Sequence, residues 1–227
     1  MTARVVTRRG GDVLDRGETG RRNGRAHLAA SPARALGAVA DDPRDEAAEA
    51  RVEVADAERL VGDAVQLWHL SDRADPAAKK LADRHYNRQS PDSAQFVPPG
   101  RCVVLRTHEA DAFWITSWPF AEYVRHAWPG AWVCSAFRNE SPHLSSALIV
   151  AAVAATRAFW TPPALGIVTF VDAAKTRRKR DPGRCFRRAG FEHVGYTKGG
   201  LYALQLMPEA MPEAMLPHGA QTELAFT

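Results

Sequence analysis

Asp172 is a carboxylate that comes directly after an apolar, β-branched run over residues 165–171. Such a run predicts a buried strand, and α/β proteins bind ligands beyond the carboxyl ends of their strands. There Asp172 can act as a base or as a hydrogen-bond acceptor that orients an aromatic exocyclic amine, whose lone pair is delocalised and poorly nucleophilic. The alternative interpretation is that Asp172 caps the turn that follows it, Ala173-Ala-Lys175.

His85 and Tyr86 are neighbours near the end of a predicted helix. His85 can serve as an acid, a base or a metal ligand, and Tyr86 can donate a proton or provide a surface on which a base stacks. Adjacent side chains on a helix point about 100° apart, so we expect the two not to face one partner closely. The alternative places Tyr86 in the core and His85 at its edge.

A basic cluster follows Asp172. From Asp172 to Lys198 the chain has nine basic and three acidic residues. Because phosphate contacts supply most non-specific affinity for nucleic acids, this cluster predicts a DNA-binding surface; a solvated loop is the alternative. The candidate nucleic-acid-binding residues are Lys175, Arg177, Arg178, Lys179, Arg180, Arg184, Arg187 and Arg188.

A second polar group lies between a predicted strand and a predicted long helix. Arg138 is a candidate for binding an anionic cofactor, and Ser145 and Ser146 can donate hydrogen bonds to an anion there. Glu140 can act as a base or ligand. The alternative is that Ser141 caps the helix and the other residues form a turn. The histidines and cysteines show no metal-ligand spacing, so we predict no metal ligands and leave a metal requirement open.

The elements that must position these residues alternate between helix and strand. A helix is predicted over Pro76–Asn87, opened by Asp75-Pro76, and a longer one over Leu144–Trp160. A short helix over Gly183–Ala189 ends at Gly190. The predicted strands are Cys102–Thr107, Ala112–Trp118, Ala131–Phe137, Leu165–Val171, Glu192–Thr197 and Leu201–Leu206. This order indicates an α/β (α+β) domain with a mixed central sheet flanked by helices.

One segment carries a family resemblance. Gly183-Arg-Cys-Phe-Arg-Arg-Ala-Gly-Phe191, followed by Glu-His-Val-Gly195, resembles the helix-to-strand segment of the GCN5-related N-acetyltransferase (GNAT) superfamily. The resemblance implies a GNAT-like fold and acyl-CoA binding at the strand–helix–strand unit over residues 131–171. Two positions depart from the pattern. The glycine-rich pyrophosphate loop reads Arg138-Asn-Glu-Ser-Pro-His-Leu-Ser-Ser146, and Phe186 stands where many members have a tyrosine as general acid.

The chain is also similar to phage DNA-modification proteins of the Mom type, a divergent GNAT-fold group. The similarity rests on His85-Tyr86, on the strand that ends Ile167-Val-Thr-Phe-Val-Asp172, and on Cys185-Phe followed by Gly-Phe191. It implies transfer of a small acyl-type group to an exocyclic base amine of DNA, with adenine as the expected base. The catalytic residues would be Asp172, His85 and Tyr86, and the donor acetyl-CoA or another acyl donor. The alternatives are an acyl-CoA-dependent N-acyltransferase acting on a small amine or protein, and a non-catalytic nucleic-acid-binding module.

Composition limits the extent of the domain. The chain has 227 residues, and all nineteen of its Phe, Trp and Tyr residues lie at or after Trp68. A segment without aromatic residues buries too little apolar surface to offset its ordering entropy. We therefore expect a disordered or weakly helical leader over residues 1–64, a catalytic domain over 65–206 and a flexible tail over 207–227, and we expect removal of 1–64 to leave fold and activity intact.

Charge, hydropathy and cysteine content exclude several classes of protein. No apolar run reaches the roughly 20 residues that a membrane span needs. The three cysteines are odd in number and widely spaced, which favours a reducing, cytoplasmic location over a disulfide framework. The net charge of +4 permits an anionic partner. The oligomeric state is left open.

Overall fold

The computed structural model describes residues 59–91, 93–97, 99–176 and 181–220. Most of the expected leader, the end of the expected tail, and Arg177, Arg178, Lys179 and Arg180 lie outside the described residues. The described part is a mixed α+β fold with a central sheet, which confirms the predicted fold class at that level.

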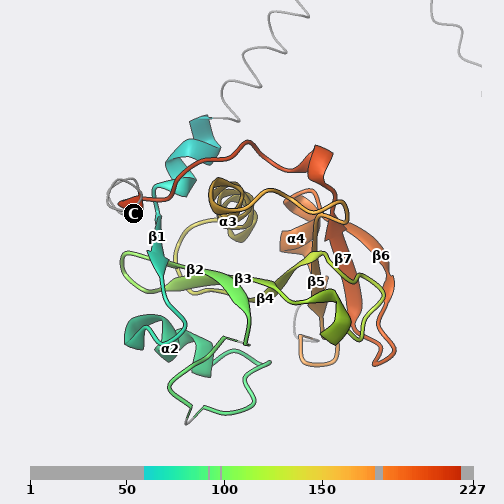
Figure 1. The fold of residues 1–227 in the computed structure, drawn as a ribbon. Coiled ribbons are helices and arrows are strands. Elements are labelled where there is room, and N and C mark those ends of the chain that lie inside the picture. The colour runs from blue at the N-terminus through green and yellow to red at the C-terminus, as the bar shows by residue number, and fades with distance from the viewer. Residues whose placement is uncertain (1–58, 92, 98, 177–180, 221–227) are drawn as a thin grey trace, which may run out of the picture. The chain divides into compact units, whose positions relative to one another are not determined.

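One seven-stranded sheet is formed within the described residues, in the order β1-β2-β3-β4-β5-β7-β6 (Figure 1). All neighbouring strands are antiparallel except β4 and β5, which are parallel. The sequence reading missed β1. The strands are β1 (Trp68–Ser71), β2 (Arg101–Thr107), β3 (Ala112–Trp118), β4 (Trp132–Asn139), β5 (Ile167–Val171), β6 (Glu192–Tyr196) and β7 (Tyr202–Leu206).

Helices cover both faces of the sheet (Figure 1). On one face lies α2 (Pro76–Asp83), together with the loop that follows it. On the other face lie α3 (Ser145–Phe159) and α4 (Arg184–Arg188). Two short 3-10 helices are also formed, η1 (Ala121–Tyr123) and η2 (Pro208–Ala210). The sheet is therefore apolar on both sides, with a core on each.

The two cores differ in size. The larger is built on α3, whose side chains from Leu148 to Thr156 are buried apart from a half-buried Val150. The smaller is formed where Leu81 of α2 packs with Phe96, Phe113 and Ile115. The smaller core underlies the loop that carries several of the candidate site residues.

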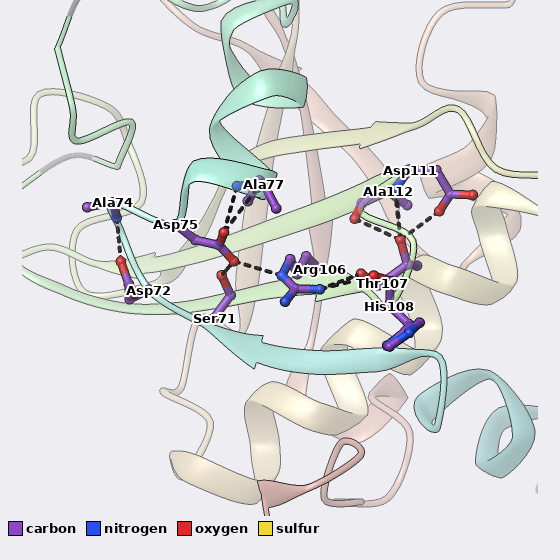
Figure 2. A network of polar contacts seen from close by, with 11 residues as sticks. Ser71, Asp72, Ala74, Asp75, Ala77, Arg106, Thr107, His108, Asp111 and Ala112 are labelled. Atoms are coloured by element: carbon purple, nitrogen blue, oxygen red, sulfur yellow. Dashed lines mark hydrogen bonds and ion pairs between the residues drawn. The ribbon is translucent and has the colours of Figure 1, made fainter.

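A polar network fixes the start of α2 to the sheet (Figure 2). The Asp75 carboxylate caps the helix by accepting from the Ala77 backbone N–H at 2.8 Å, and it also accepts from Ser71 and from Arg106 Nε, each at 2.7 Å. Burial would raise the pKa of Asp75, but these three hydrogen bonds outweigh burial and leave the pKa lowered. The helix is thus attached to both β1 and β2 by one carboxylate.

Two predicted helix ends are corrected. The helix expected to run to Asn87 ends at Asp83, because Arg84 and His85 donate to carbonyls only three residues back, Leu81 and Ala82. Ser141 is not the N-cap of α3, which begins after Leu144. The Ser141 hydroxyl instead donates to Asn139 Oδ1 at 2.6 Å, within the turn that precedes the helix.

The described fold extends beyond residues 65–206 at both ends. Residues 59–65 are helical, and Ala64 is buried in the larger core. At the other end, Met211 and Ala220 are buried, and the His218 backbone N–H donates to the Trp68 carbonyl at 2.9 Å. The folded unit therefore includes residues 59–64 and 207–220, because each segment packs apolar side chains against the larger core.

Candidate functional site

The parallel strands β4 and β5 separate after a short pairing. They pair only from Trp132↔Ile167 to Cys134↔Thr169, although β4 continues to Asn139 and β5 to Val171. The register of β4 against β3 shifts at the same place, so Ser135 is skipped in the backbone pairing with β3. A bulge of this kind bends a strand. The bulge lies where the gap between β4 and β5 opens.

A pocket of about 750 Å³ occupies this gap, and we call it the β4–β5 pocket. It is bounded by β4, β5, the first turn of α3 and the segment around α4. Its polar and charged lining includes Arg138, Asn139, Ser145, Ser146, Lys175, Asp181, Arg184 and Arg188.

A second pocket, of about 740 Å³, lies beside the first, and we call it the loop pocket. One side is the loop after α2, and the base is the smaller core. Its lining includes Arg88, Gln89, Ser90, Ser93, Gln95, Phe96, Val97, Phe113, Ile115 and Asp172.

The candidate residues divide between the two pockets. Arg138, Ser145 and Ser146 line only the β4–β5 pocket, whereas Asp172 lines only the loop pocket. His85 and Tyr86 line both. The structure thus brings the predicted catalytic and cofactor-binding residues into one region, with His85 and Tyr86 at the boundary.

His85 lies in the turn after α2 and not on the helix. Its ring therefore stacks on that of Tyr86, with centroids 4.5 Å apart, which corrects the expected 100° divergence. His85 Nδ1 accepts from the Asn87 backbone N–H at 3.2 Å, and the ring also bonds the Phe137 backbone. We assign the proton to Nε2 from these bonds. Both ring nitrogens are thus engaged in holding the turn in place.

The pKa of His85 agrees with a role in positioning Tyr86. Burial lowers the pKa of His85 to about 4, and the guanidinium of Arg138 acts in the same direction, while the bond to Phe137 opposes them. The imidazole is therefore neutral at neutral pH. It holds the ring of Tyr86 between the two pockets.

Tyr86 is 38% exposed, so it is not a core residue. Burial of its hydroxyl raises the pKa of Tyr86, against a smaller opposite effect of the Asp172 backbone amide. The Lys175 Nζ lies 6.0 Å from the centre of the tyrosine ring. Tyr86 thus keeps its proton at neutral pH and is suited to donate a proton rather than to accept one.

Asp172 performs the capping role that was the alternative interpretation. Its Oδ1 accepts from the backbone N–H groups of Ala174 at 2.9 Å and Lys175 at 3.1 Å. The Thr176 hydroxyl donates to the Asp172 carbonyl at 2.7 Å. These bonds fix the carboxylate at the end of β5, where it also lines the loop pocket.

Glu140 is held between two arginines. Arg84 Nη2 lies 2.7 Å from Glu140 Oε2, and Arg138 Nε lies 2.6 Å from Oε1. These hydrogen bonds lower the pKa of Glu140 to about 2, so it is a poor base at neutral pH. Glu140 therefore orients Arg138 at the pocket edge and also neutralises part of its charge.

The first turn of α3 opens onto the β4–β5 pocket. The N-cap residue, Leu144, has no side-chain hydrogen bond to the helix. Ser145 and Ser146 are the first two helical residues, and Asn139 Nδ2 donates to Ser145 Oγ at 3.0 Å. Backbone N–H groups at a helix start have no partner within the helix and favour anions.

The described basic residues do not act as one group. Lys175, Arg184 and Arg188 line the β4–β5 pocket. Arg187 forms an ion pair with Asp181, and it lines neither pocket. Within the described ranges no ion pair to Arg184 or Arg188 is found.

Sequence reasoning missed part of both pockets. Cys134 and Cys185 line the β4–β5 pocket, and burial raises the pKa of the Cys134 thiol, which keeps it protonated. Gln89, Gln95 and Phe96 of the loop pocket were not among the candidate residues. The signal that could have found them is a segment with several side-chain amides beside an aromatic residue.

Among the described residues no group of three or more His, Cys, Asp or Glu is arranged to hold a metal ion.

No protein-family model matches the chain, and neither a curated protein nor a solved structure matches it. No helix in the described ranges has the length and apolar character needed to cross a membrane.

Proposed function

We propose that this protein is a group transferase of GNAT-like fold that modifies an exocyclic amine of a base in DNA, with adenine as the expected base. The observation that carries the proposal is the pair of pockets meeting at Tyr86. A transferase needs a site for a donor, a site for an acceptor, and a proton-transferring group between them. The candidate residues are distributed in that way.

The β4–β5 pocket suits an anionic acyl donor such as acetyl-CoA. Four basic side chains line it, Arg138, Lys175, Arg184 and Arg188, against one acidic side chain, Asp181. The start of α3 adds backbone donors for a phosphate. An acyl donor bound there supplies the group to be transferred and a leaving group.

The loop pocket suits the amine. Asp172 is held by two backbone N–H groups at its Oδ1 and lines this pocket. A carboxylate there accepts a hydrogen from an exocyclic amine and orients its nitrogen toward Tyr86. When the new N–C bond forms, the bond between the acyl carbon and the leaving group of the donor breaks, and the leaving group keeps that electron pair. Tyr86 gives a proton to the leaving group and recovers one from the amine, so no net proton is gained or lost.

Nucleoside analysis tests the proposal. DNA from cells that express the full chain is digested and examined by mass spectrometry for a nucleoside of increased mass. Tyr86→Phe keeps the ring that stacks on His85 but removes the proton, so we expect at least about a hundredfold less modified nucleoside. Tyr123→Phe is the matched control, because Tyr123 is 74% exposed and lines neither pocket.

The outcomes are distinct. Modified nucleoside with the wild type and with Tyr123→Phe, but not with Tyr86→Phe, supports the proposal. Unchanged DNA in cells that contain the folded wild-type protein contradicts it.

A second candidate is an N-acyltransferase acting on a small amine or a protein. The observation that favours it is the charge of the loop pocket: Asp172 and Lys175 balance each other, so this pocket has no excess of positive charge. It predicts saturable acetyl-CoA binding and acetyl transfer that do not depend on DNA, which calorimetry and an activity assay without DNA would detect.

A further inference from the structure

We infer that the loop pocket is a receptor for a single unstacked nucleobase, read by the side-chain amides of Gln89 and Gln95. This inference rests on the proposed function, because it assumes that the acceptor belongs to DNA, and it adds where the base lies and which residues select it.

The base of the loop pocket is apolar and aromatic. Phe96 and Phe113 meet edge to face with ring centroids 6.3 Å apart, and His85 meets Phe113 in the same way at 6.2 Å. The stacked rings of His85 and Tyr86 form the side shared with the β4–β5 pocket. Because Phe96 and Phe113 are themselves buried, the planar surface that a ligand can reach is that of the His85–Tyr86 pair. Such a surface favours the face of a heterocycle over a flexible aliphatic amine.

The rim of the loop pocket consists of neutral hydrogen-bonding groups. Asn87, Gln89 and Gln95 contribute side-chain amides, and Ser90 and Ser93 contribute hydroxyls. A side-chain amide has a donor and an acceptor side by side, which matches the paired ring nitrogen and amino group of adenine. The rim therefore has the chemistry to recognise a base by its edge.

The loop that carries this rim is held in place by two basic side chains that donate to backbone carbonyl groups. Arg88 pairs with Asp83 at 2.9 Å and donates to the carbonyls of Ser93 at 2.7 Å and Gln95 at 3.1 Å. Lys79 donates to the Pro91 carbonyl at 2.6 Å. A pocket held in shape before binding loses less conformational entropy when it takes its ligand.

Those bonds also decide the charge of the loop pocket. Arg88 is used within the protein, so the remaining charged side chains on the lining are Asp172 and Lys175. The pocket thus favours a neutral base over a phosphate group. Phosphates fit better at the positively charged β4–β5 pocket and its edge.

The test uses a short thymine-rich DNA strand with one 2-aminopurine, whose fluorescence responds to stacking, and a terminal dye for anisotropy. The wild-type chain should change the 2-aminopurine emission in a saturable way. Gln89→Leu/Gln95→Leu should weaken that saturation at least about fivefold while the anisotropy still reports binding of the strand. Gln66→Leu is the matched control, because Gln66 is exposed and lines neither pocket.

The outcomes separate this inference from the proposed function. If the strand binds but 2-aminopurine emission is unchanged, or if the double variant saturates like Gln66→Leu, the inference is wrong, even where modified nucleoside has been found in cells. If emission changes as expected but cellular DNA is unmodified, the base receptor stands and the transferase proposal fails. Saturable binding of small amines without any binding of the strand contradicts both.

Discussion

The two pockets have nearly equal volumes, about 750 and 740 Å³, but the charged side chains on their linings differ. The β4–β5 pocket is formed by the separation of two strands and carries an excess of basic side chains. The loop pocket is formed by a segment packed on the smaller core. Of its two basic residues, Arg88 is paired with Asp83, and Lys175 is shared with the β4–β5 pocket. The difference indicates that size does not assign a ligand, whereas the distribution of unneutralised charge does.

The largest expected effect concerns His85, which lies between the pockets. Its pKa in the folded protein, about 4, is below the ordinary value of 6.5, so the unfolded chain binds the proton first as the pH falls. The stability contributed by the neutral ring is complete above pH 6.5 and is lost between pH 6.5 and 4. The loss amounts to about 3 kcal/mol.

Urea unfolding at several pH values measures this loss. In His85→Gln the free energy of unfolding should fall less over the same pH range than in the wild type, because glutamine does not titrate. It should still fall somewhat, because His69 and His126 also have lowered pKa values and remain in both proteins. Equal slopes for the two proteins would mean that His85 is not buried as a neutral ring.

The next effect tests the charge of the β4–β5 pocket. Arg184→Glu/Arg188→Glu should weaken acetyl-CoA binding about thirtyfold at low salt, and the loss should shrink as the salt concentration rises, because salt screens the attraction of the donor's phosphates. Arg125→Glu, at an exposed position on neither pocket, is the single-charge control. Unchanged acetyl-CoA binding in the double variant would place the phosphates of the donor elsewhere on the protein.

A smaller effect distinguishes the supports of the two pockets. Asp75 attaches α2 to the sheet (Figure 2). The loop after α2 forms one side of the loop pocket, whereas only its first residues, His85 to Asn87, also line the β4–β5 pocket. Asp75→Ala should lower the free energy of unfolding by about 1–2 kcal/mol, because the helix loses its cap and Arg106 its partner. Binding of the 2-aminopurine strand should weaken more than binding of acetyl-CoA, and equal weakening would show that the pockets are not supported separately.

The smallest effect concerns the edge of the larger core. A chain that begins at residue 65 lacks Val61 and Ala64, whereas a chain that begins at 59 keeps both. The shorter chain should be less stable by about 1–2 kcal/mol. Identical thermal unfolding of the two would restore the boundary predicted from composition.

The sequence indicated most of the sheet because its strands are apolar runs with clear ends. Ala112–Trp118 was predicted at its exact limits, and α3 within one residue at each end. The four-residue β1 was missed because so short a segment has no readable periodicity. Some of the residues that line the two pockets were named, but the shape of the pockets was not predicted.

The shape of the pockets could not be predicted because it depends on contacts between residues that are far apart in the sequence. The bulge at Ser135 depends on the pairing of β4 with β3, and the gap beyond Cys134 depends on the pairing of β4 with β5. Neither can be read from local spacing. The stacking of His85 on Tyr86 follows from the early end of α2, where helix periodicity gives a different answer.

The central claim is that the two pockets hold two different ligands, and a pair of substitutions tests it most directly. Ser146→Trp fills the β4–β5 pocket, and Gln95→Leu removes an amide from the loop pocket. Acetyl-CoA binding by calorimetry and 2-aminopurine emission are measured for both variants. The account predicts that Ser146→Trp weakens only acetyl-CoA binding and that Gln95→Leu weakens only the response of the base. Parallel losses in both measurements, or binding of neither ligand by the wild type, would contradict it.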